Sequence, residues 1–257
     1  MSITVDLVAD LGESFGAYTM GADDDLLEIV SSANVACGFH AGDPRVMDRT
    51  VAECARRGVG LGAHPSFPDL VGFGRRAMDL TPDEVRTDIL YQLGALSAFA
   101  AAHGTEVTHL CPHGRLGNLV ITRPDYAEAM VSAVHQFDPS IIVFTQAGAV
   151  EPAADALGLR VAYVGAVDRT YEDDGTLTPR AVSGSVLHDP DEIAERTVRM
   201  VTRGEIVSRQ GNVLPIRTDT VLLHGDGPTA VDLARRIRRD LVTAGVTIAP
   251  LHRTLAS

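Results

Sequence analysis

The stretch Asn34–Pro44, Asn-Val-Ala-Cys-Gly-Phe-His-Ala-Gly-Asp-Pro, contains a complete transition from a strand to a helix. Its first part, Asn34–Gly38, is short and apolar, as in a buried strand. Asp43 then supplies a helix N-cap and Pro44 a first helical residue, so we predict that a helix begins here. The apolar residues that follow repeat at helical spacing: Met47, Val51, Cys54 and Ala55. The stretch is therefore one βα unit.

The same alternation of strand and helix continues on both sides of this unit. A helix is expected around Asp23–Ser32, and a capping box at Thr81–Glu84 opens the longest helix, which ends at Gly104. We predict further strands at Ile3–Asp10, Val59–Ala63, Glu106–Cys111, Ile141–Thr145, Leu159–Val164, Thr220–Leu223 and Val246–Ala249. Seven or eight βα units in succession favour a closed barrel, although an open doubly wound sheet has the same signature.

No segment rich in Pro, Gly and Ser separates two halves, so we expect residues 1–257 to form one domain. Glu205–Arg217 interrupts the βα pattern and is typical of a hairpin, with Gln210-Gly211 at its turn. With 45% hydrophobic and 22% charged residues, the composition is that of a globular protein with a full core.

Charge and composition exclude several classes of protein. The net charge of −12 would repel a phosphate backbone, so we expect no nucleic acid partner. All 22 basic residues are Arg, which rules out a Walker loop and a Schiff-base lysine. We expect neither export nor membrane insertion, because the N-terminus lacks a basic region and no apolar run approaches ~20 residues. Three cysteines are an odd count that suits reduced thiols in a cytoplasm.

Polar side chains gather where the predicted strands end. In parallel α/β folds these carboxyl ends form the site. We predict a catalytic cluster from the residues at the strand ends, whose members are Asp10, Glu13, His40, His64 and His113. Neutral imidazole is both a common general base and a common metal ligand, and a carboxylate can orient it or activate water. Three of these residues, Asp10, His40 and His64, are candidate ligands for a divalent metal such as Zn²⁺.

Alternation along the strands predicts which side chains share the barrel interior. If His64 points inward, Gly62 and Gly60 do too, which would leave open space below the imidazole. The same parity groups other polar residues, placing Asp6 with Asp10, Asn34 near His40, and His109 with Cys111 and His113. An interior lined with His, Asp and Gly is unusual, since barrel interiors are normally filled with Val, Ile and Leu.

Other polar residues are candidates for binding a small acidic substrate. Arg75 and Arg76 lie in the loop after the third strand, and a guanidinium group pairs bidentately with a carboxylate. The remaining candidates are Asn34, Asp43, Asn118, Arg169, Arg180, His224 and Asp226. Cys111 shares a strand face with His113 and could act as a thiol nucleophile, but a buried inert thiol is the more common role of such a cysteine.

The motifs at the strand ends resemble the LamB/YcsF family from residue 9 to residue 227. The matching segments are Ala9–Glu13, Ser31–Asn34, Ala36–Asp43, Gly62–Asp69, Phe73–Arg76, Tyr91–Leu96, Pro112–Gly114, Asp168-Arg169, Pro179-Arg180, Ser183-Gly184 and Leu223–Gly227. The resemblance implies a distorted β/α barrel of the glycoside hydrolase and deacetylase type. It also implies the A subunit of 5-oxoprolinase, in which ATP drives hydrolysis of 5-oxoproline to glutamate with B and C subunits as partners.

The chain departs from the family's pattern at three positions. Cys111 replaces a Lys, Gly117 stands in the place of a Tyr, and Val8 stands where the family favours Asn. A cation and a phenol are thereby lost, which would suit a divergent paralogue. Two alternatives therefore stay open beside the cyclic-amide hydrolase: a metal-dependent deacetylase-like hydrolase acting on a small acidic or carbohydrate substrate, and a non-catalytic barrel that binds a small acid. The sequence also leaves the oligomeric state open, a homo-oligomer included.

Overall fold

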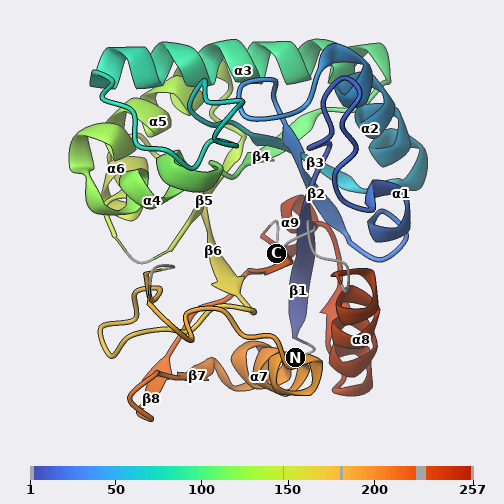
Figure 1. Ribbon diagram of the computed structural model, residues 1–257, viewed down its shortest axis with the longest axis vertical. Coiled ribbons are helices and arrows are strands. Elements are labelled where there is room, and N and C mark those ends of the chain that lie inside the picture. The colour runs from blue at the N-terminus through green and yellow to red at the C-terminus, as the bar shows by residue number, and fades with distance from the viewer. Residues whose placement is uncertain (1–2, 147, 180–181, 224–229, 256–257) are drawn as a thin grey trace.

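A parallel barrel forms the centre of the computed structural model, which describes residues 3–146, 148–179, 182–223 and 230–255 (Figure 1). Neighbouring strands pair in the order β1, β2, β3, β4, β5, β6 and β9, and β9 returns to pair with β1. The strands are β1 (Thr4–Leu11), β2 (Ser32–Ala36), β3 (Gly60–His64), β4 (Val107–Leu110), β5 (Ile142–Thr145), β6 (Val161–Ala166) and β9 (Thr220–Leu223). The predicted barrel is thus confirmed, and the open sheet is excluded.

Two smaller elements complete the β-structure. β10 (Thr247–Ile248) pairs in parallel with the beginning of β1 at Thr4 and Val5, beside the closed ring of seven strands. β7 (Glu205–Val207) and β8 (Val213–Pro215) form the antiparallel hairpin expected within Glu205–Arg217. Gly211 has a φ of +92° in the connecting turn, a conformation that favours glycine.

Helices surround the barrel, with the long α3 crossing one end of the view in Figure 1 and α7 and α8 lying at the other. They are α1 (Asp23–Leu26), α2 (Pro44–Arg57), α3 (Pro82–Ala102), α4 (Gly114–Thr122), α5 (Pro124–Phe137), α6 (Val150–Ala156), α7 (Pro190–Arg203), α8 (Ala230–Thr243) and α9 (Leu251–Thr254). In the described part of the chain, no helix combines the length and apolar character needed to cross a membrane.

The first helix and the second strand differ from prediction at their boundaries. The helix expected around Asp23–Ser32 ends at Leu26, and β2 already begins at Ser32. Ser31 explains the early strand, because its backbone N–H donates to the Leu7 carbonyl oxygen at 2.8 Å and draws the segment onto β1. The Asp43 cap and the Thr81–Glu84 capping box are both present as expected.

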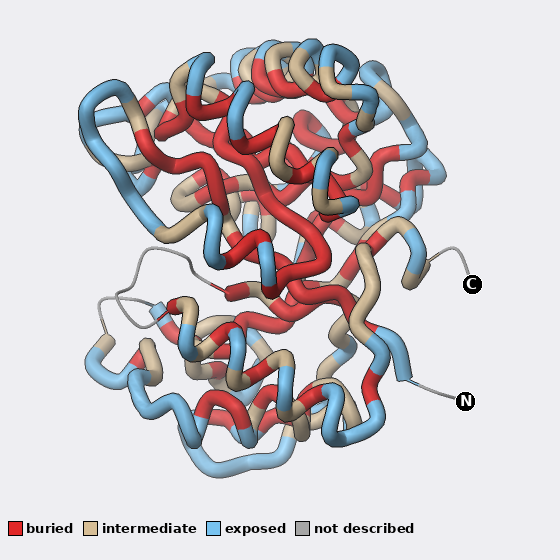
Figure 2. Tube along the Cα trace, turned by 90° about the vertical axis from the view of Figure 1, so that its right-hand side faces the viewer, coloured by how far each residue is buried: buried red, intermediate tan, exposed pale blue. Residues whose placement is uncertain are grey.

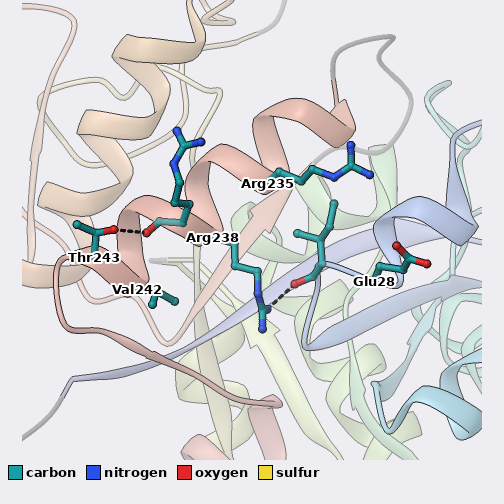
Figure 3. Close-up of a pocket in the computed structure, with 7 residues that line it drawn as sticks. Glu28, Arg235, Arg238, Val242 and Thr243 are labelled. Carbon is teal, nitrogen blue, oxygen red and sulfur yellow. Dashed lines mark hydrogen bonds between the residues drawn. The ribbon is translucent and has the colours of Figure 1, made fainter.

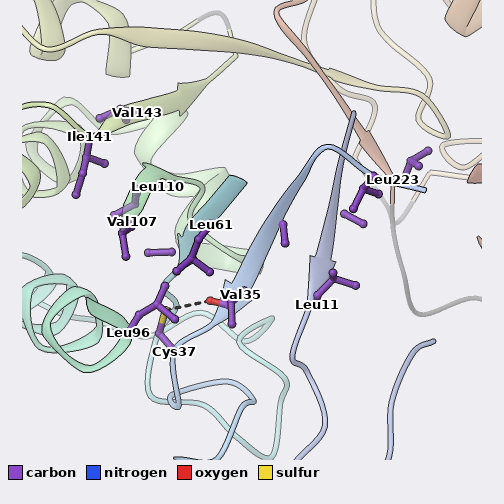
Figure 4. Close-up of a cluster of buried hydrophobic side chains, with 14 of the residues drawn as sticks. Leu11, Val35, Cys37, Leu61, Leu96, Val107, Leu110, Ile141, Val143 and Leu223 are labelled. Atoms are coloured by element: carbon purple, nitrogen blue, oxygen red, sulfur yellow. Dashed lines mark hydrogen bonds between the residues drawn. The ribbon is translucent and has the colours of Figure 1, made fainter. Parts of the chain in front are cut away.

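The apolar side chains of the barrel pack in two layers, and the buried segments of the tube follow the barrel in Figure 2. The larger layer lies between the strands and the helices, where Leu11, Val35, Leu61 and Leu110 meet residues such as Leu96 of α3 (Figure 4). The smaller layer contains side chains that alternate with these along the strands, joined by Cys111 after β4 and Leu251 of α9. The strand residues are Val8, Ile142, Phe144, Ala162 and Val164. Leu251 of α9 belongs to this inner cluster, so the C-terminal helix closes the N-terminal end of the barrel.

A surface pocket of about 450 Å³ lies between α8 and the segment after α1 (Figure 3). Its lining residues are Glu28, Ile29, Arg235, Arg238, Arg239, Val242 and Thr243. The Arg238 guanidinium donates to the Ile29 carbonyl oxygen, so this arginine ties α8 to the barrel's outer layer. None of the candidate catalytic residues lines this pocket.

A buried carboxylate lies near the start of β1, away from the strand ends that carry the candidate site. Asp6 accepts hydrogen bonds from the hydroxyls of Ser31 at 2.8 Å, Ser32 at 2.6 Å and Thr220 at 2.6 Å. Burial nevertheless dominates and raises the pKa of Asp6 from 3.8 to about 6. Asp6 therefore ties β1 to both of its neighbouring strands, but its charged form is disfavoured by the barrel interior.

The raised pKa makes stability depend on pH in a defined direction. Between pH 3.8 and about 6 the folded state binds the Asp6 proton more tightly than the unfolded state does. The contribution of protonated Asp6 to the free energy of unfolding is fully present below pH 3.8. It is lost as the pH rises through about 6. The free energy of unfolding of the wild type, minus that of Asp6→Asn, should fall by about 3 kcal/mol from about pH 3.5 to about pH 7, as measured by urea denaturation.

A matched control is Asp240→Asn, because Arg236 lowers the pKa of the Asp240 carboxyl instead of raising it. The same subtraction for this surface variant should change in the opposite direction between the two pH values. A pH-independent difference for Asp6→Asn would show that the carboxyl is hydrated in the folded protein.

Candidate active site

Four buried side chains converge at the carboxyl ends of adjacent strands. Glu13 follows β1, His40 follows β2, His64 ends β3, and His113 follows β4. One ligand atom from each lies within 4.8 Å of those of the others. The barrel thus brings together residues that lie far apart in the sequence. Four of the five predicted catalytic residues form this cluster, which we call the Glu–His cluster.

The protonation of two of these histidines is set by backbone carbonyls. His64 Nδ1 lies 2.6 Å from the Cys111 carbonyl oxygen, and His113 Nε2 lies 2.9 Å from the Phe73 carbonyl oxygen. Because a carbonyl oxygen can only accept, both of these nitrogens must donate. The other ring nitrogens, His64 Nε2 and His113 Nδ1, then carry lone pairs, and they face each other at 3.0 Å. Two lone pairs at this distance require a cation, either a proton or a metal ion.

Burial disfavours a proton on His113 and on His40. Desolvation, followed by the neighbouring His64, lowers the pKa of His113 to about 3. Desolvation and the charges of His113, His64 and Arg75 likewise hold the pKa of His40 well below its usual value. The His40 and His113 rings are stacked with centroids 3.9 Å apart, so charging one would also penalise the other. Neutral imidazole is the form that binds metal.

Glu13 completes a ligand set suited to a divalent ion. Its Oε1 atom lies 3.2 Å from His40 Nε2 and 3.5 Å from His113 Nδ1. His40 Nδ1, by contrast, is buried and has no hydrogen-bond partner among the described residues. Imidazole nitrogens and a carboxylate oxygen are ligands that Zn²⁺ and similar ions accept. The set differs from the predicted Asp10, His40 and His64, because it includes Glu13 and His113 and leaves out Asp10.

Asp10 lies at the edge of the cluster and is held by a chain of hydrogen bonds. Its Oδ1 atom accepts from Asn34 Nδ2 at 2.9 Å and lies 3.4 Å from His64 Nε2. Asn34 Oδ1 in turn lies 3.1 Å from His109 Nε2. Asn34 therefore orients the Asp10 carboxylate inside the barrel.

His109 fills the space that the glycine pattern had suggested was open. The imidazole lies so close to Gly62 that a Cβ atom there would overlap it, and it stacks on Phe144 with centroids 4.7 Å apart. Burial lowers the pKa of His109 to about 3, so its ring is neutral. The expected cavity below His64 is thus wrong: the missing side chain of Gly62 accommodates an imidazole. The sequence signal for His109 was the alternation of side chains along β4, which placed it on the same strand face as Cys111 and His113.

The two candidate arginines of the loop after β3 have different roles. Arg76 forms an ion pair with the buried Asp69 carboxylate, which commits its guanidinium. Arg75 is exposed, its guanidinium lies 5.3 Å from the Phe73 ring centroid, and its charge lowers the pKa of both His40 and His113. Of the two, Arg75 is therefore placed beside the cluster.

The remaining candidates do not join the cluster. Asp43 accepts from the backbone N–H groups of Arg45 at 2.8 Å and Gly16 at 2.7 Å, so it caps α2 and fixes the loop after β1. Asn118 is exposed on α4. Arg169 is buried and donates to the carbonyl oxygens of Ser185 and Thr178. Arg180, His224 and Asp226 lie outside the described residues.

Cys111 belongs to the inner apolar cluster rather than to the polar one. Burial, with a smaller contribution from Asp10, raises the pKa of its thiol well above the usual value. The thiol is therefore protonated at neutral pH and does not supply a thiolate nucleophile. Val8 lies in the same apolar cluster, so two of the positions that depart from the family's pattern share one environment.

Comparison with known proteins gives matches over the whole barrel. The chain is 50% identical over 252 residues to the A subunit of 5-oxoprolinase from Methylococcus capsulatus, with 98% of this chain and 97% of that protein covered. It is 49% identical over 248 residues to the corresponding 5-oxoprolinase subunit of Pyrococcus furiosus, covering 96% and 97% of the two chains.

Solved structures match the same architecture. The lactam utilization protein from Thermus thermophilus superposes with a TM-score of 0.92 at 43% identity, covering 96% of this chain and 99% of that one. The peptidoglycan deacetylase PdaC from Bacillus subtilis shares the fold alone, with a TM-score of 0.54 at 14% identity over 99% of this chain and 91% of that one. The model of the LamB/YcsF family matches residues 5–256. This chain therefore belongs to the LamB/YcsF family.

Proposed function

We propose that this chain is the A subunit of an ATP-dependent 5-oxoprolinase and hydrolyses the cyclic amide of 5-oxo-L-proline to give L-glutamate. Relatives of about the same length are named as this subunit of 5-oxoprolinase. The observation that carries the proposal is the convergence of Glu13, His40, His64 and His113 at the mouth of the barrel. Such a cluster suits hydrolysis of an amide, which needs an activated water and a proton for the leaving nitrogen.

The residues of the site divide these tasks between them. A divalent ion held by the Glu–His cluster would lower the pKa of a bound water and polarise the amide carbonyl. Asp10 lies 3.4 Å from His64 Nε2 and is oriented by Asn34, so we assign it the transfer of the proton from water to the leaving nitrogen. His64 and His113 keep fixed tautomers and direct their lone pairs into the site.

Arg75 would bind the substrate carboxylate. 5-Oxoproline carries one carboxylate beside its lactam, and a guanidinium group pairs with it through two parallel hydrogen bonds. Arg75 is exposed and lies beside Phe73, at the edge of the Glu–His cluster. Binding at the rim would orient the lactam carbonyl towards the Glu–His cluster.

ATP and partner subunits belong to the proposal as well. The chain has no Lys and hence no Walker loop, so we propose that ATP acts in a complex with B and C subunits in the cytoplasm. Of the alternative functions, the ligand set of the Glu–His cluster supports a metal-dependent deacetylase-like hydrolase. That enzyme would release acetate without ATP, which separates the two functions.

The first test is ATP-dependent glutamate formation from 5-oxoproline by this chain co-purified with its B and C subunits. We expect turnover by the wild type. Cys111→Lys should be less stable and no more active, because the ammonium group would enter an apolar cluster. Activity found only in the variant, or in neither protein, would indicate a different substrate.

A second prediction concerns the Glu–His cluster. His64→Ala removes the nitrogen at the centre of the cluster and should lower kcat/KM at least about 100-fold. Elemental analysis should show loss of bound divalent metal in the same variant. The control is His103→Ala, because His103 is bonded to Asp48 on the surface and lies outside the cluster. Unchanged metal content in His64→Ala would remove this histidine from the ligand set.

A third prediction concerns substrate binding. Arg75→Gln should raise KM about 10- to 100-fold, since a charge-assisted pair to a carboxylate is lost, with kcat within about threefold. Arg56→Gln is the matched control, because Arg56 pairs with Glu53 on the outer surface of α2. Steady-state kinetics that show an unchanged KM for Arg75→Gln would assign the carboxylate to another residue.

A further inference from the structure

One loop residue, Phe73, covers the Glu–His cluster. Its carbonyl oxygen accepts from His113 Nε2 at 2.9 Å. Its ring lies edge-on to His113, with centroids 4.9 Å apart, and edge-on to His40, at 5.5 Å. Phe73 therefore fixes one ring nitrogen of His113 and shields two imidazoles from water.

The backbone of Phe73 is held in an unfavourable conformation. Its φ is +53°, and it is the one non-glycine residue with a positive φ in the part of the chain that the structure describes. A bulky residue is strained in this region and persists there only where neighbouring contacts impose the conformation. Contacts of this kind are present within the same loop.

Asp69 supplies those contacts on both sides of Phe73. The buried Asp69 carboxylate accepts from the backbone N–H of Gly72 at 2.9 Å and of Arg76 at 3.2 Å. The Asp69 carbonyl oxygen accepts from the Gly74 N–H at 2.9 Å. The Arg76 guanidinium neutralises the carboxylate and holds the pKa of Asp69 below its usual value. A single aspartate thus holds the backbone on both sides of Phe73.

Close packing leaves the loop little freedom to adopt another conformation. A Cβ atom on Gly72 would overlap the Asp69 carboxylate, and one on Gly74 would overlap Ser66 Oγ. Ser66 is itself fixed by Gln92, which accepts from its N–H and donates to its carbonyl oxygen, each at 2.9 Å. The loop is therefore clamped to α3 as well as to Asp69.

We propose that Asp69 is a positioning residue for the Glu–His cluster. By holding the Phe73 carbonyl against His113 Nε2, it keeps the proton on that nitrogen and leaves the lone pair of Nδ1 directed at His64 and Glu13. The proposal rests on the proposed function only for its effect on rate. Loss of such a supporting contact typically lowers metal affinity or activity about 10- to 100-fold, and we expect a loss of this size in kcat for Asp69→Asn, with little change in KM.

The proposal is tested without metal, substrate or partner subunits by NMR of the chelator-treated chain labelled with ¹⁵N-histidine. Ring N–H protons that are buried and hydrogen-bonded exchange slowly with water and give visible signals. We expect one from His113 Nε2 and one from His64 Nδ1, each assigned from a His→Gln variant. In Asp69→Asn the His113 signal should disappear and the His64 signal should remain, because His64 donates to Cys111 and not to the loop.

Two further variants sharpen the result. Arg76→Gln retains the Asp69 carboxylate but removes its cation, so it should weaken the same His113 signal. It takes the place of Asp69→Asn if that variant fails to fold. Asp125→Asn also breaks an arginine pair, with Arg123 at the start of α5, and should change neither signal. Persistence of the His113 signal in the Asp69 and Arg76 variants would overturn the proposal. So would loss of both histidine signals in a folded Asp69→Asn protein, since that would indicate general loosening of the barrel.

Discussion

The site depends on two imidazole lone pairs that face each other at 3.0 Å. Neither His64 nor His113 can turn its proton inward, because the Cys111 and Phe73 carbonyl oxygens each hold it on the opposite nitrogen. A proton shared between the rings would relieve the repulsion, but desolvation disfavours the charged form of His113 by lowering its pKa. The two lone pairs therefore give the mouth of the barrel an affinity for a cation. The Glu13 carboxylate lies beside them, 3.5 Å from His113 Nδ1.

Holding this arrangement requires a polar interior, which most barrels avoid. His109, Asn34 and Asp10 form a hydrogen-bonded chain below the cluster, in which each side chain has a polar partner. Gly62 makes the chain possible because a side chain there would overlap His109. An unpaired polar group in such a place would cost roughly 1–3 kcal/mol. The barrel interior is therefore polar on the side of His109, Asn34 and Asp10. It is apolar on the other side, where Phe144 packs.

The sequence pattern was sufficient to group the residues at the strand ends, and it favoured a barrel without excluding an open sheet. Parallel strands end at one rim, so Glu13, His40 and His113 could be grouped from strand order alone. It was not sufficient where the answer depends on distances between separate segments. The occupation of the space beside Gly62 by His109, and the division of roles between Arg75 and Arg76, follow from packing and from the buried Asp69. Periodicity carries no information about which of two adjacent arginines pairs with the buried Asp69 carboxylate.

Two of the departures from the family's pattern lie in the interior of the barrel. Val8 on β1 and Cys111 after β4 lie in one apolar cluster with Ile142 and Phe144. A Lys side chain among these apolar groups would need a polar partner to offset the loss of hydration, and Val8 cannot provide one. With Cys111 and Val8 at these two positions the cluster stays apolar, so neither side chain needs a polar partner there. The Glu–His cluster is unaffected, because Cys111 contributes to it only through its backbone carbonyl, which any residue at that position would supply.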